Sequence, residues 1–175
     1  MSIFTEKEDL NKVIETAKTW DFVDTDEIYL IGESQGGLVT NMVANSRTDI
    51  KGCILWYPAF NIPGGARATY SDESKIPDTI SVFGMKLGKI YYSSILNYDP
   101  YKDMQNINYK VLLVHGTSDV VVPLSVSEEA TKCYKESELE TVVGANHCFY
   151  DSSFSYNEEY MKKAVDITLK CFKIN

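Results

Sequence analysis

A serine in a glycine-rich turn is the residue in this sequence best placed to do chemistry. Residues 28–37 read IYLIGESQGG, an apolar run that leads through G-x-S-x-G into a predicted helix. Between a strand and a helix, this motif strains the serine backbone and exposes its hydroxyl. Ser34 is therefore a candidate nucleophile, and the backbone N–H of Gln35 is a candidate oxyanion donor. Glycine is expected to be required at positions 32 and 36, because a Cβ at either position would collide with the facing strand or helix.

Two further polar residues stand at equivalent places along the chain. Asp119 follows a predicted strand over 110–114, and His147 follows another over 139–143. Catalytic groups of open α/β sheets gather at the carboxyl ends of strands. A serine hydroxyl needs an imidazole to accept its proton, and the imidazole needs a carboxylate to fix its tautomer. A glycine-rich turn with a surface serine is the alternative, but three agreeing placements favour a serine hydrolase.

Three segments carry a resemblance to a known family. Residues 32–37 (GESQGG), 115–123 (HGTSDVVVP) and 144–149 (GANHCF) resemble the motif blocks of α/β-hydrolases. Within that superfamily the chain most resembles the bacterial feruloyl (cinnamoyl) esterase-like hydrolases, and YPAFNIP at 57–63 fits that group. The similarity runs over residues 5–172, nearly the whole chain.

The resemblance implies a role for each candidate residue. Ser34 is the nucleophile, His147 is the general base and acid, and Asp119 is the carboxylate that orients His147. The backbone N–H of Gln35 supplies an oxyanion donor. The implied activity is a serine carboxylesterase that forms an acyl-enzyme and cleaves short-chain or hydroxycinnamoyl esters. No metal and no cofactor is expected, because no phosphate loop, dinucleotide fingerprint or metal-ligand cluster is found.

Other titratable residues near these motifs are given structural roles. His115 directly follows a strand and is expected to position the loop of Asp119. Cys148 is expected to be a small inward-facing residue. Asp99 and Asp103 compete for the role of the acid, but they lie at the wrong end of the third predicted strand.

The elements that must position these residues alternate along the chain. Apolar runs predict strands over 28–31, 52–57, 110–114 and 139–143. Helical spacing predicts helices over 5–20, 38–44, 125–134 and 160–172, with capping boxes at 5–8 and 125–128. This alternation indicates a three-layer α/β/α fold with a mostly parallel sheet of about four strands. Residues 1–175 are predicted to form one domain, and 61–99, with little regular pattern apart from a helix over 87–95, a lid-like insertion.

The resemblance also implies what the chain lacks. The family normally has four further strands before the helix at Thr5, and one of their loops carries an H-G-x-x-G-type oxyanion segment. The His-Gly pair of this chain, His115-Gly116, belongs to the block of the acid. The chain is therefore expected to be a truncated α/β-hydrolase with half of the oxyanion hole, and loss of one donor costs on the order of 10²–10³ in rate. The strand over 28–31 would be an open apolar edge, which predicts a homodimer or higher oligomer through that edge.

Composition narrows the remaining possibilities. The chain has 175 residues, 44% of them hydrophobic, and a net charge of −8. The negative charge argues against nucleic acid and against an anionic membrane surface, and no apolar run reaches the roughly 18 residues of a membrane span. Residues 1–9 are too charged for a signal peptide. Four widely spaced cysteines without a C-x-x-C pair favour free thiols in the cytoplasm.

Two other functions stay open from the sequence. A peptidase or thioesterase of the α/β-hydrolase type would share the three candidate residues and differ in its pocket. The second is a catalytically weak or inactive hydrolase remnant with an assembly or binding role. The missing oxyanion segment favours it, and the presence of Ser34, Asp119 and His147 opposes it.

Overall fold

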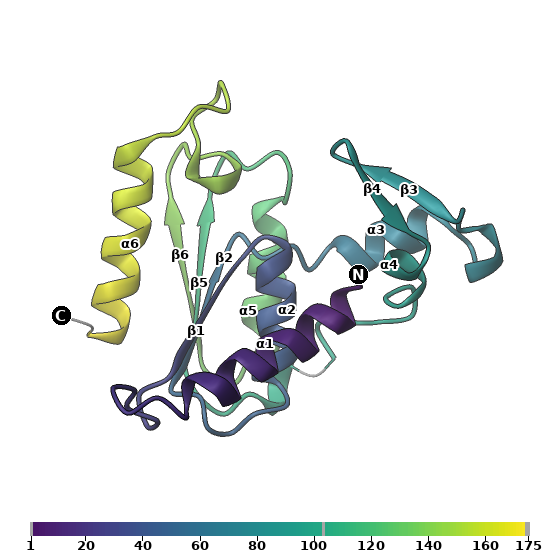
Figure 1. Ribbon diagram of the computed structural model, residues 1–175. Helices are drawn as coiled ribbons and strands as arrows, with labels where there is room; N and C mark the ends of the chain where they lie inside the picture. The colour runs from purple at the N-terminus through teal and green to yellow at the C-terminus, as the bar shows by residue number, and fades with distance from the viewer. Residues whose placement is uncertain (1, 103, 174–175) are drawn as a thin grey trace.

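Parallel strands make the central sheet of the chain (Figure 1). The computed structural model describes residues 2–102 and 104–173. The strands of this sheet are β1 (Tyr29–Glu33), β2 (Gly52–Trp56), β5 (Val111–Gly116) and β6 (Ser137–Val142). Their spatial order is β1-β2-β5-β6, and each neighbouring pair is parallel. The predicted α/β fold with a parallel sheet of about four strands is therefore confirmed.

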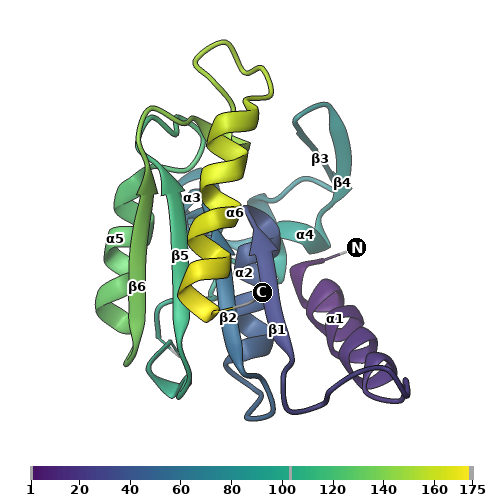
Figure 2. The same cartoon turned by 90° about the vertical axis from the view of Figure 1, so that its left-hand side faces the viewer.

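Helices cover both faces of this sheet. The long helices are α1 (Ile3–Ala17), α2 (Gln35–Ala44), α5 (Leu124–Cys133) and α6 (Glu158–Phe172). Figures 1 and 2 show α6 on one face and α1, α2 and α5 on the other. Along β2, Cys53 and Leu55 join the core beneath α2 and α5, whereas Ile54 and Trp56 join the core beneath α6. Burial on both faces explains why this strand is a continuous apolar run.

Each long helix begins one to three residues before its predicted start, and two of them lack the capping box that the sequence predicted. At α1 the Ser2 hydroxyl accepts the backbone N–H of Thr5, and the Thr5 hydroxyl accepts that of Ser2. The capping box expected at Thr5 and Glu8 is wrong because Ser2 supplies an earlier cap. The box expected at 125–128 is also wrong, because the N-cap of α5 is Pro123, which makes no side-chain capping bond. The proline ring restricts φ and so starts the helix without a polar cap.

Residues 61–99, named here the insertion, hold more regular structure than expected. They contain α3 (Ile62–Thr69), η1 (Glu73–Lys75), the hairpin strands β3 (Thr79–Val82) and β4 (Met85–Gly88), and α4 (Ile90–Ser93). The helix predicted over 87–95 is wrong in its first turn, because Leu87 pairs with Ile80 across the hairpin. A small apolar core is shared by Ala66, Ile76, Ile80 and Leu96. Single 3-10 turns lie outside the insertion at Met104–Asn106 (η2) and His147–Phe149 (η3).

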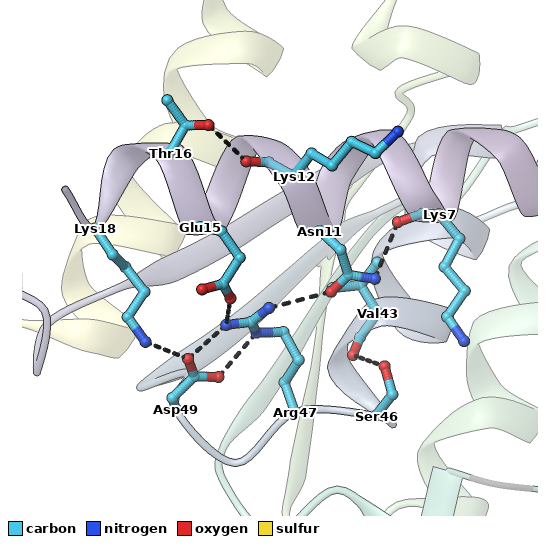
Figure 3. Close-up of polar contacts among 10 residues, drawn as sticks. All are labelled: Lys7, Asn11, Lys12, Glu15, Thr16, Lys18, Val43, Ser46, Arg47 and Asp49. Carbon is cyan, nitrogen blue, oxygen red and sulfur yellow. Dashed lines mark hydrogen bonds and ion pairs between the residues drawn. The ribbon is translucent and has the colours of Figure 1, made fainter.

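An ion-pair network fixes the C-terminal half of α1 against the loop that follows α2 (Figure 3). The Arg47 guanidinium donates to both carboxylate oxygens of Asp49. It also donates to Glu15 and Asn11 of α1. Lys18, just beyond the helix, donates to Asp49 at 2.6 Å. These hydrogen bonds, with Arg47 contributing most, hold the pKa of the Asp49 carboxyl well below its usual range.

Replacing Arg47 by methionine should loosen α1. Arg47→Met keeps aliphatic packing but removes every donor, so we expect the free energy of unfolding to fall by about 1–2 kcal/mol after solvent screening. Because folding lowers the pKa of Asp49, this difference is present above about pH 4 and shrinks as the pH falls below that value. Urea unfolding of both proteins at neutral and acidic pH measures it. Lys162→Met, which removes an exposed pair with Asp166, is the control, and an equal loss there would contradict the prediction.

The strand β1 forms one edge of the sheet. Of the described strands, β2 is the one hydrogen-bonded to it. Ile31, in the middle of β1, is 54% exposed. A shallow groove between α1 and β1 runs beside this edge and is lined by apolar residues that include Val13 and Ile28. The open apolar edge that the sequence predicted is therefore present.

Two further properties bear on the sequence predictions. Within residues 2–102 and 104–173, no helix has the length and apolar character needed to cross a bilayer. Cys53, Cys133, Cys148 and Cys171 are all free thiols, and Cys53 is fully buried.

Candidate active site

Ser34 lies on the sharp turn between β1 and α2. Its φ of 49° and ψ of −120° are outside the regions that L-residues normally occupy, and such a conformation costs on the order of 1–3 kcal/mol. Backbone hydrogen bonds hold it there. The Ser34 N–H donates to the carbonyl of Trp56 at 3.0 Å, and the Ser34 carbonyl accepts the N–H of Ala59 at 2.8 Å. The turn therefore has the strained backbone that the motif predicted.

The glycines of this turn differ in what they permit. A Cβ on Gly32 would lie 2.3 Å from Thr40 Oγ1 and 2.4 Å from the carbonyl oxygen of Gly36, so β1 and α2 meet there in close contact. A Cβ on Gly36 would meet nothing within 4 Å, so the predicted collision at that position is wrong. The other close approach is at Gly37, where a Cβ would lie 2.8 Å from the Cβ of Pro58.

This difference makes a pair of alanine substitutions informative. Gly32→Ala should lower the free energy of unfolding by about 1–3 kcal/mol, because the added methyl group forces backbone to move at a packed site. Gly36→Ala should be neutral or stabilising by about 0.5–1 kcal/mol, because alanine is favoured over glycine inside a helix. Thermal unfolding of the two variants beside the wild type measures both effects. Equal destabilisation by the two substitutions would contradict the packing described for the turn.

Ser34, His147 and Asp119 form a chain of hydrogen bonds across the carboxyl ends of the strands. Ser34 Oγ lies 3.0 Å from His147 Nε2, and His147 Nδ1 lies 2.8 Å from Asp119 Oδ2. An ionised carboxylate only accepts, so Nδ1 carries the proton and Nε2 is left to accept from the serine hydroxyl. In this arrangement the imidazole is able to take the serine proton. The fold thus brings together the three side chains that the sequence singled out, from positions after β1, β5 and β6.

Asp119 is held as a carboxylate by its surroundings. The residue is 8% exposed, and its Oδ1 accepts the backbone N–H groups of Val121 at 2.9 Å and Val122 at 2.8 Å. Its Oδ2 faces His147, and His115 Nε2 lies 3.4 Å from the same oxygen. Burial by itself would raise the pKa of Asp119. Hydrogen bonds from the two histidines and from the Val122 N–H outweigh burial and hold that pKa well below its usual range.

His115 supports the loop of Asp119 from inside the protein. The ring is fully buried, with Nδ1 2.7 Å from Ser127 Oγ and Nε2 2.9 Å from the carbonyl oxygen of Val122. Because a carbonyl only accepts, Nε2 carries the proton and Nδ1 accepts from the Ser127 hydroxyl. Both ring nitrogens are thus engaged in holding the loop, as expected for a positioning residue.

The loop that carries His147 is tied to the loop that follows β5. Asn146 Oδ1 accepts the backbone N–H of His147 at 2.8 Å and that of Val120 at 3.1 Å. At the end of β5 the two loops touch directly, since a Cβ on Gly116 would lie 2.3 Å from the carbonyl oxygen of Ala145. These contacts fix the distance between the imidazole and its carboxylate.

Tyr57 is a site residue that the sequence analysis did not single out. Its ring packs edge-on to His147, with centroids 4.8 Å apart, and its hydroxyl donates to Glu33 Oε2 at 2.6 Å. Tyr57 therefore links the residue before Ser34 to the imidazole. The sequence predicted a strand over 52–57 with Tyr57 as its last residue, whereas β2 ends at Trp56. A hydroxyl at the carboxyl end of a strand was therefore the available signal.

The remaining candidates from the sequence do not join this chain of hydrogen bonds. Burial, together with nearby carboxylate charge, raises the pKa of the Cys148 thiol, which disfavours the reactive thiolate. Asp99 is exposed and accepts the backbone N–H of Tyr101 at 3.0 Å. Asp103 lies outside the described residues.

The backbone N–H of Gln35 is the first of α2. Groups in the first turn of a helix have no partner within the helix, and the helix dipole is positive at this end. An oxyanion that develops on a carbonyl carbon bonded to Ser34 Oγ would form next to this N–H group.

Ser34 lines an apolar pocket of about 390 Å³. The sheet side of the pocket contributes Ser34, Gln35, Val121 and Val122. The hairpin and α4 of the insertion contribute Val82, Phe83, Met85, Leu87, Tyr91 and Tyr92. The insertion therefore forms much of the pocket wall.

The parallel sheet with helices on both faces and the strained serine turn after β1 define an α/β-hydrolase. Comparison with known proteins identifies the family within this class. The sequence pattern of the prolyl oligopeptidase family matches residues 5–174, and the chain belongs to that family. No curated protein sequence matches it.

Solved structures agree with this assignment. Est1E from Butyrivibrio proteoclasticus superposes with a TM-score of 0.86 and 30% identity, over 100% of this chain and 72% of Est1E. A structure with ferulic acid bound to Est1E gives a TM-score of 0.83 at 30% identity, over 97% and 69%. A monoacylglycerol lipase from Paleococcus ferrophilus, at 18% identity and a TM-score of 0.73 over 99% and 76%, shares the fold. The resemblance to feruloyl esterase-like α/β-hydrolases is thereby confirmed.

Proposed function

We propose that this chain is a serine carboxylesterase that forms an acyl-enzyme on Ser34. The observation that carries the proposal is the chain of hydrogen bonds from Ser34 through His147 to Asp119. Its serine end lines an apolar pocket. Membership of a hydrolase family supports the reaction class. The proposal adds the nucleophile, the bond that is cleaved and the role of each residue.

The proposed reaction proceeds in two transfers. Ser34 Oγ attacks the ester carbonyl carbon while its proton passes to His147 Nε2, and the resulting oxyanion accepts the N–H of Gln35. Collapse of this intermediate breaks the bond to the alcohol, which leaves with the proton from His147. Water then attacks the acyl-enzyme by the same route, releasing the acid and restoring Ser34. Asp119 keeps the imidazole in the required tautomer and stabilises its charged form.

Short-chain or hydroxycinnamoyl esters are the proposed substrates. Aromatic side chains of the insertion, including Phe83, Tyr91 and Tyr92, line the pocket beside its aliphatic residues, and aromatic rings pack favourably on one another. The bound ferulic acid of Est1E, a protein 30% identical to this chain, supports an aromatic acyl group.

Intact mass after incubation with a fluorophosphonate tests the proposed nucleophile. Such a probe phosphonylates a serine that a base has activated, so the intact mass should show one adduct per chain. The masses of the digested peptides should then place it on the peptide that contains Ser34. Hydrolysis of methyl ferulate, 4-nitrophenyl acetate and a long-chain 4-nitrophenyl ester then ranks the acyl groups. A folded chain that takes no adduct and cleaves none of these esters would overturn the proposal.

The family match favours one alternative, a peptidase, because it is named for prolyl oligopeptidase. A prolyl anilide and an acyl thioester, assayed beside the esters, distinguish peptidase and thioesterase from esterase by their relative kcat/KM. A hydrolase remnant with a binding role would take no adduct, yet would bind ferulate in a calorimeter.

We also propose that the chain self-associates through β1 and that it works in the cytoplasm. The exposed backbone of an edge strand, next to the half-exposed Ile31, favours pairing with a second copy. Light scattering at high micromolar concentration should give a dimer or larger species, and a monomer at every concentration would contradict it.

The proposed cytoplasmic location rests on the four free thiols.

A further inference from the structure

The side chain of Gln35 joins three parts of the chain beside the nucleophile. Its Nε2 donates to both carboxylate oxygens of Glu6, at 3.0 and 2.8 Å. Its Oε1 accepts the hydroxyl of Tyr91 at 2.6 Å. A carboxylate only accepts, so the amide nitrogen must face Glu6, and the amide oxygen must then face the tyrosine. The amide has one orientation in which both neighbours are satisfied.

Both neighbours of this amide lie on helices that other contacts hold in place. Glu6 belongs to the first turn of α1, whose other half is fixed by the Arg47 network shown in Figure 3. Tyr91 belongs to α4 of the insertion and is 4% exposed. Burial, followed by the charges of Tyr92 and Glu6, raises the pKa of Tyr91 to about 12, so its hydroxyl stays a donor at neutral pH.

We infer that Glu6 and Tyr91 are positioning residues that, together with the backbone hydrogen bonds of Ser34, hold the direction of the Gln35 backbone N–H. The inference rests on the proposed function, in which that N–H stabilises the oxyanion. The peptide that carries this N–H is held on its carbonyl side, because the Ser34 oxygen accepts the N–H groups of Ala59 and Gly37. On its other side lies Gln35 itself, the first residue of α2. The bonds to its side chain restrain the residue on two sides and link the oxyanion donor to α1 and to the insertion.

The chemistry makes such a restraint valuable. An oxyanion donor acts through a short, well-aligned hydrogen bond to a charge that exists only in the transition state. A donor displaced by a fraction of an ångström therefore lowers kcat more than it changes KM. A residue that merely stabilised the fold would lower the melting temperature without this selective effect.

A reversal of the hydrogen-bonded pair tests the inference. Gln35→Glu sets two carboxylates against each other, and we expect the rate of fluorophosphonate labelling and kcat for 4-nitrophenyl acetate to fall about tenfold or more. Glu6→Gln keeps one acceptor and should lower both about threefold. In the double variant the amide at position 6 donates to the carboxylate at position 35, which Tyr91 also satisfies, so both rates should return to within about twofold of the wild type.

Matched controls separate positioning from stability. Glu8→Gln makes the same charge change on an exposed position of α1 and should leave labelling, kcat and KM unchanged. Melting temperatures are measured for all variants. Recovery in the double variant, with KM changed less than about twofold throughout, supports the inference. If the wild type is labelled and the single variants are labelled equally fast, or if the double variant is as slow as Gln35→Glu, the inference is overturned. A wild type that takes no label removes the proposed function, and this inference with it.

Discussion

Ser34→Ala is expected to lower kcat for a short-chain ester by about 10⁴-fold or more and to abolish labelling by a fluorophosphonate. Alanine retains the Cβ but removes the only atom at this position that is able to attack a carbonyl carbon. The neighbouring imidazole is then left without a proton to accept. Steady-state kinetics and intact mass, measured on the same preparations, check both parts of the prediction.

The control for this substitution lies at the other end of the same helix. Ser46 Oγ donates to the carbonyl of Val43 at 2.9 Å, just beyond the end of α2. Ser46→Ala should keep full labelling and kcat. The Ser34→Ala variant should also melt within a few degrees of the wild type, since the hydrogen bond that it loses is worth about 0.5–1.5 kcal/mol. Activity that persists in a folded Ser34→Ala protein would show that another residue is the nucleophile.

The sheet and the three polar residues at its carboxyl ends were predictable because each rests on a local signal. An apolar run followed by a polar residue marks the end of a buried strand, and parallel strands bring such ends to one edge. Ser34, Asp119 and His147 each follow such a run, and their side chains meet. Gly32 was predictable for the same reason, because the turn requires a close approach of strand and helix.

The insertion was harder to predict because its structure depends on contacts within itself. Pro63 and two glycines suggested irregular chain, yet α3 forms there, with the proline in its first turn, where its missing N–H costs nothing. The hairpin turns at Phe83 and Gly84, both with positive φ, whereas the usual sequence signal is Asn-Gly or Asp-Gly. A phenylalanine at such a position carries no turn signal, so the strands on either side were missed.

The supporting contacts of the site carry no sequence signal at all. The link from Glu6 to Gln35 spans 29 positions and the link from Tyr91 spans 56. Neither spacing follows a helix or strand period, so only the assembled fold reveals them. The same holds for Tyr57 and Glu33, whose contact joins the ends of β2 and β1.

Asp119→Asn is expected to lower kcat by about 10⁴-fold while the fold is retained, and the reason lies in the orientation of the new amide. Asp119 Oδ1 accepts two backbone N–H groups, from Val121 and Val122. In the variant the amide oxygen must keep that place, because an NH₂ group there would face two donors. The amide nitrogen then faces His147 Nδ1 and donates to it. The proton of the imidazole moves to Nε2, where it faces Ser34 Oγ. A protonated Nε2 is unable to accept the serine proton.

The matched control is the same substitution at the competing carboxylate. Asp99 is exposed and accepts one backbone N–H, a bond that the amide oxygen of Asp99→Asn is able to keep, so kcat and labelling should match the wild type. Steady-state kinetics and the labelling rate measure both variants, and thermal unfolding verifies that each is folded. If Asp119→Asn lowers kcat by less than about tenfold, the tautomer of His147 does not control the reaction, and activation of Ser34 must come from the imidazole without its carboxylate. A large loss confined to Asp119→Asn instead means that the two backbone donors, by fixing the orientation of one side chain, decide which nitrogen of His147 is available to the nucleophile.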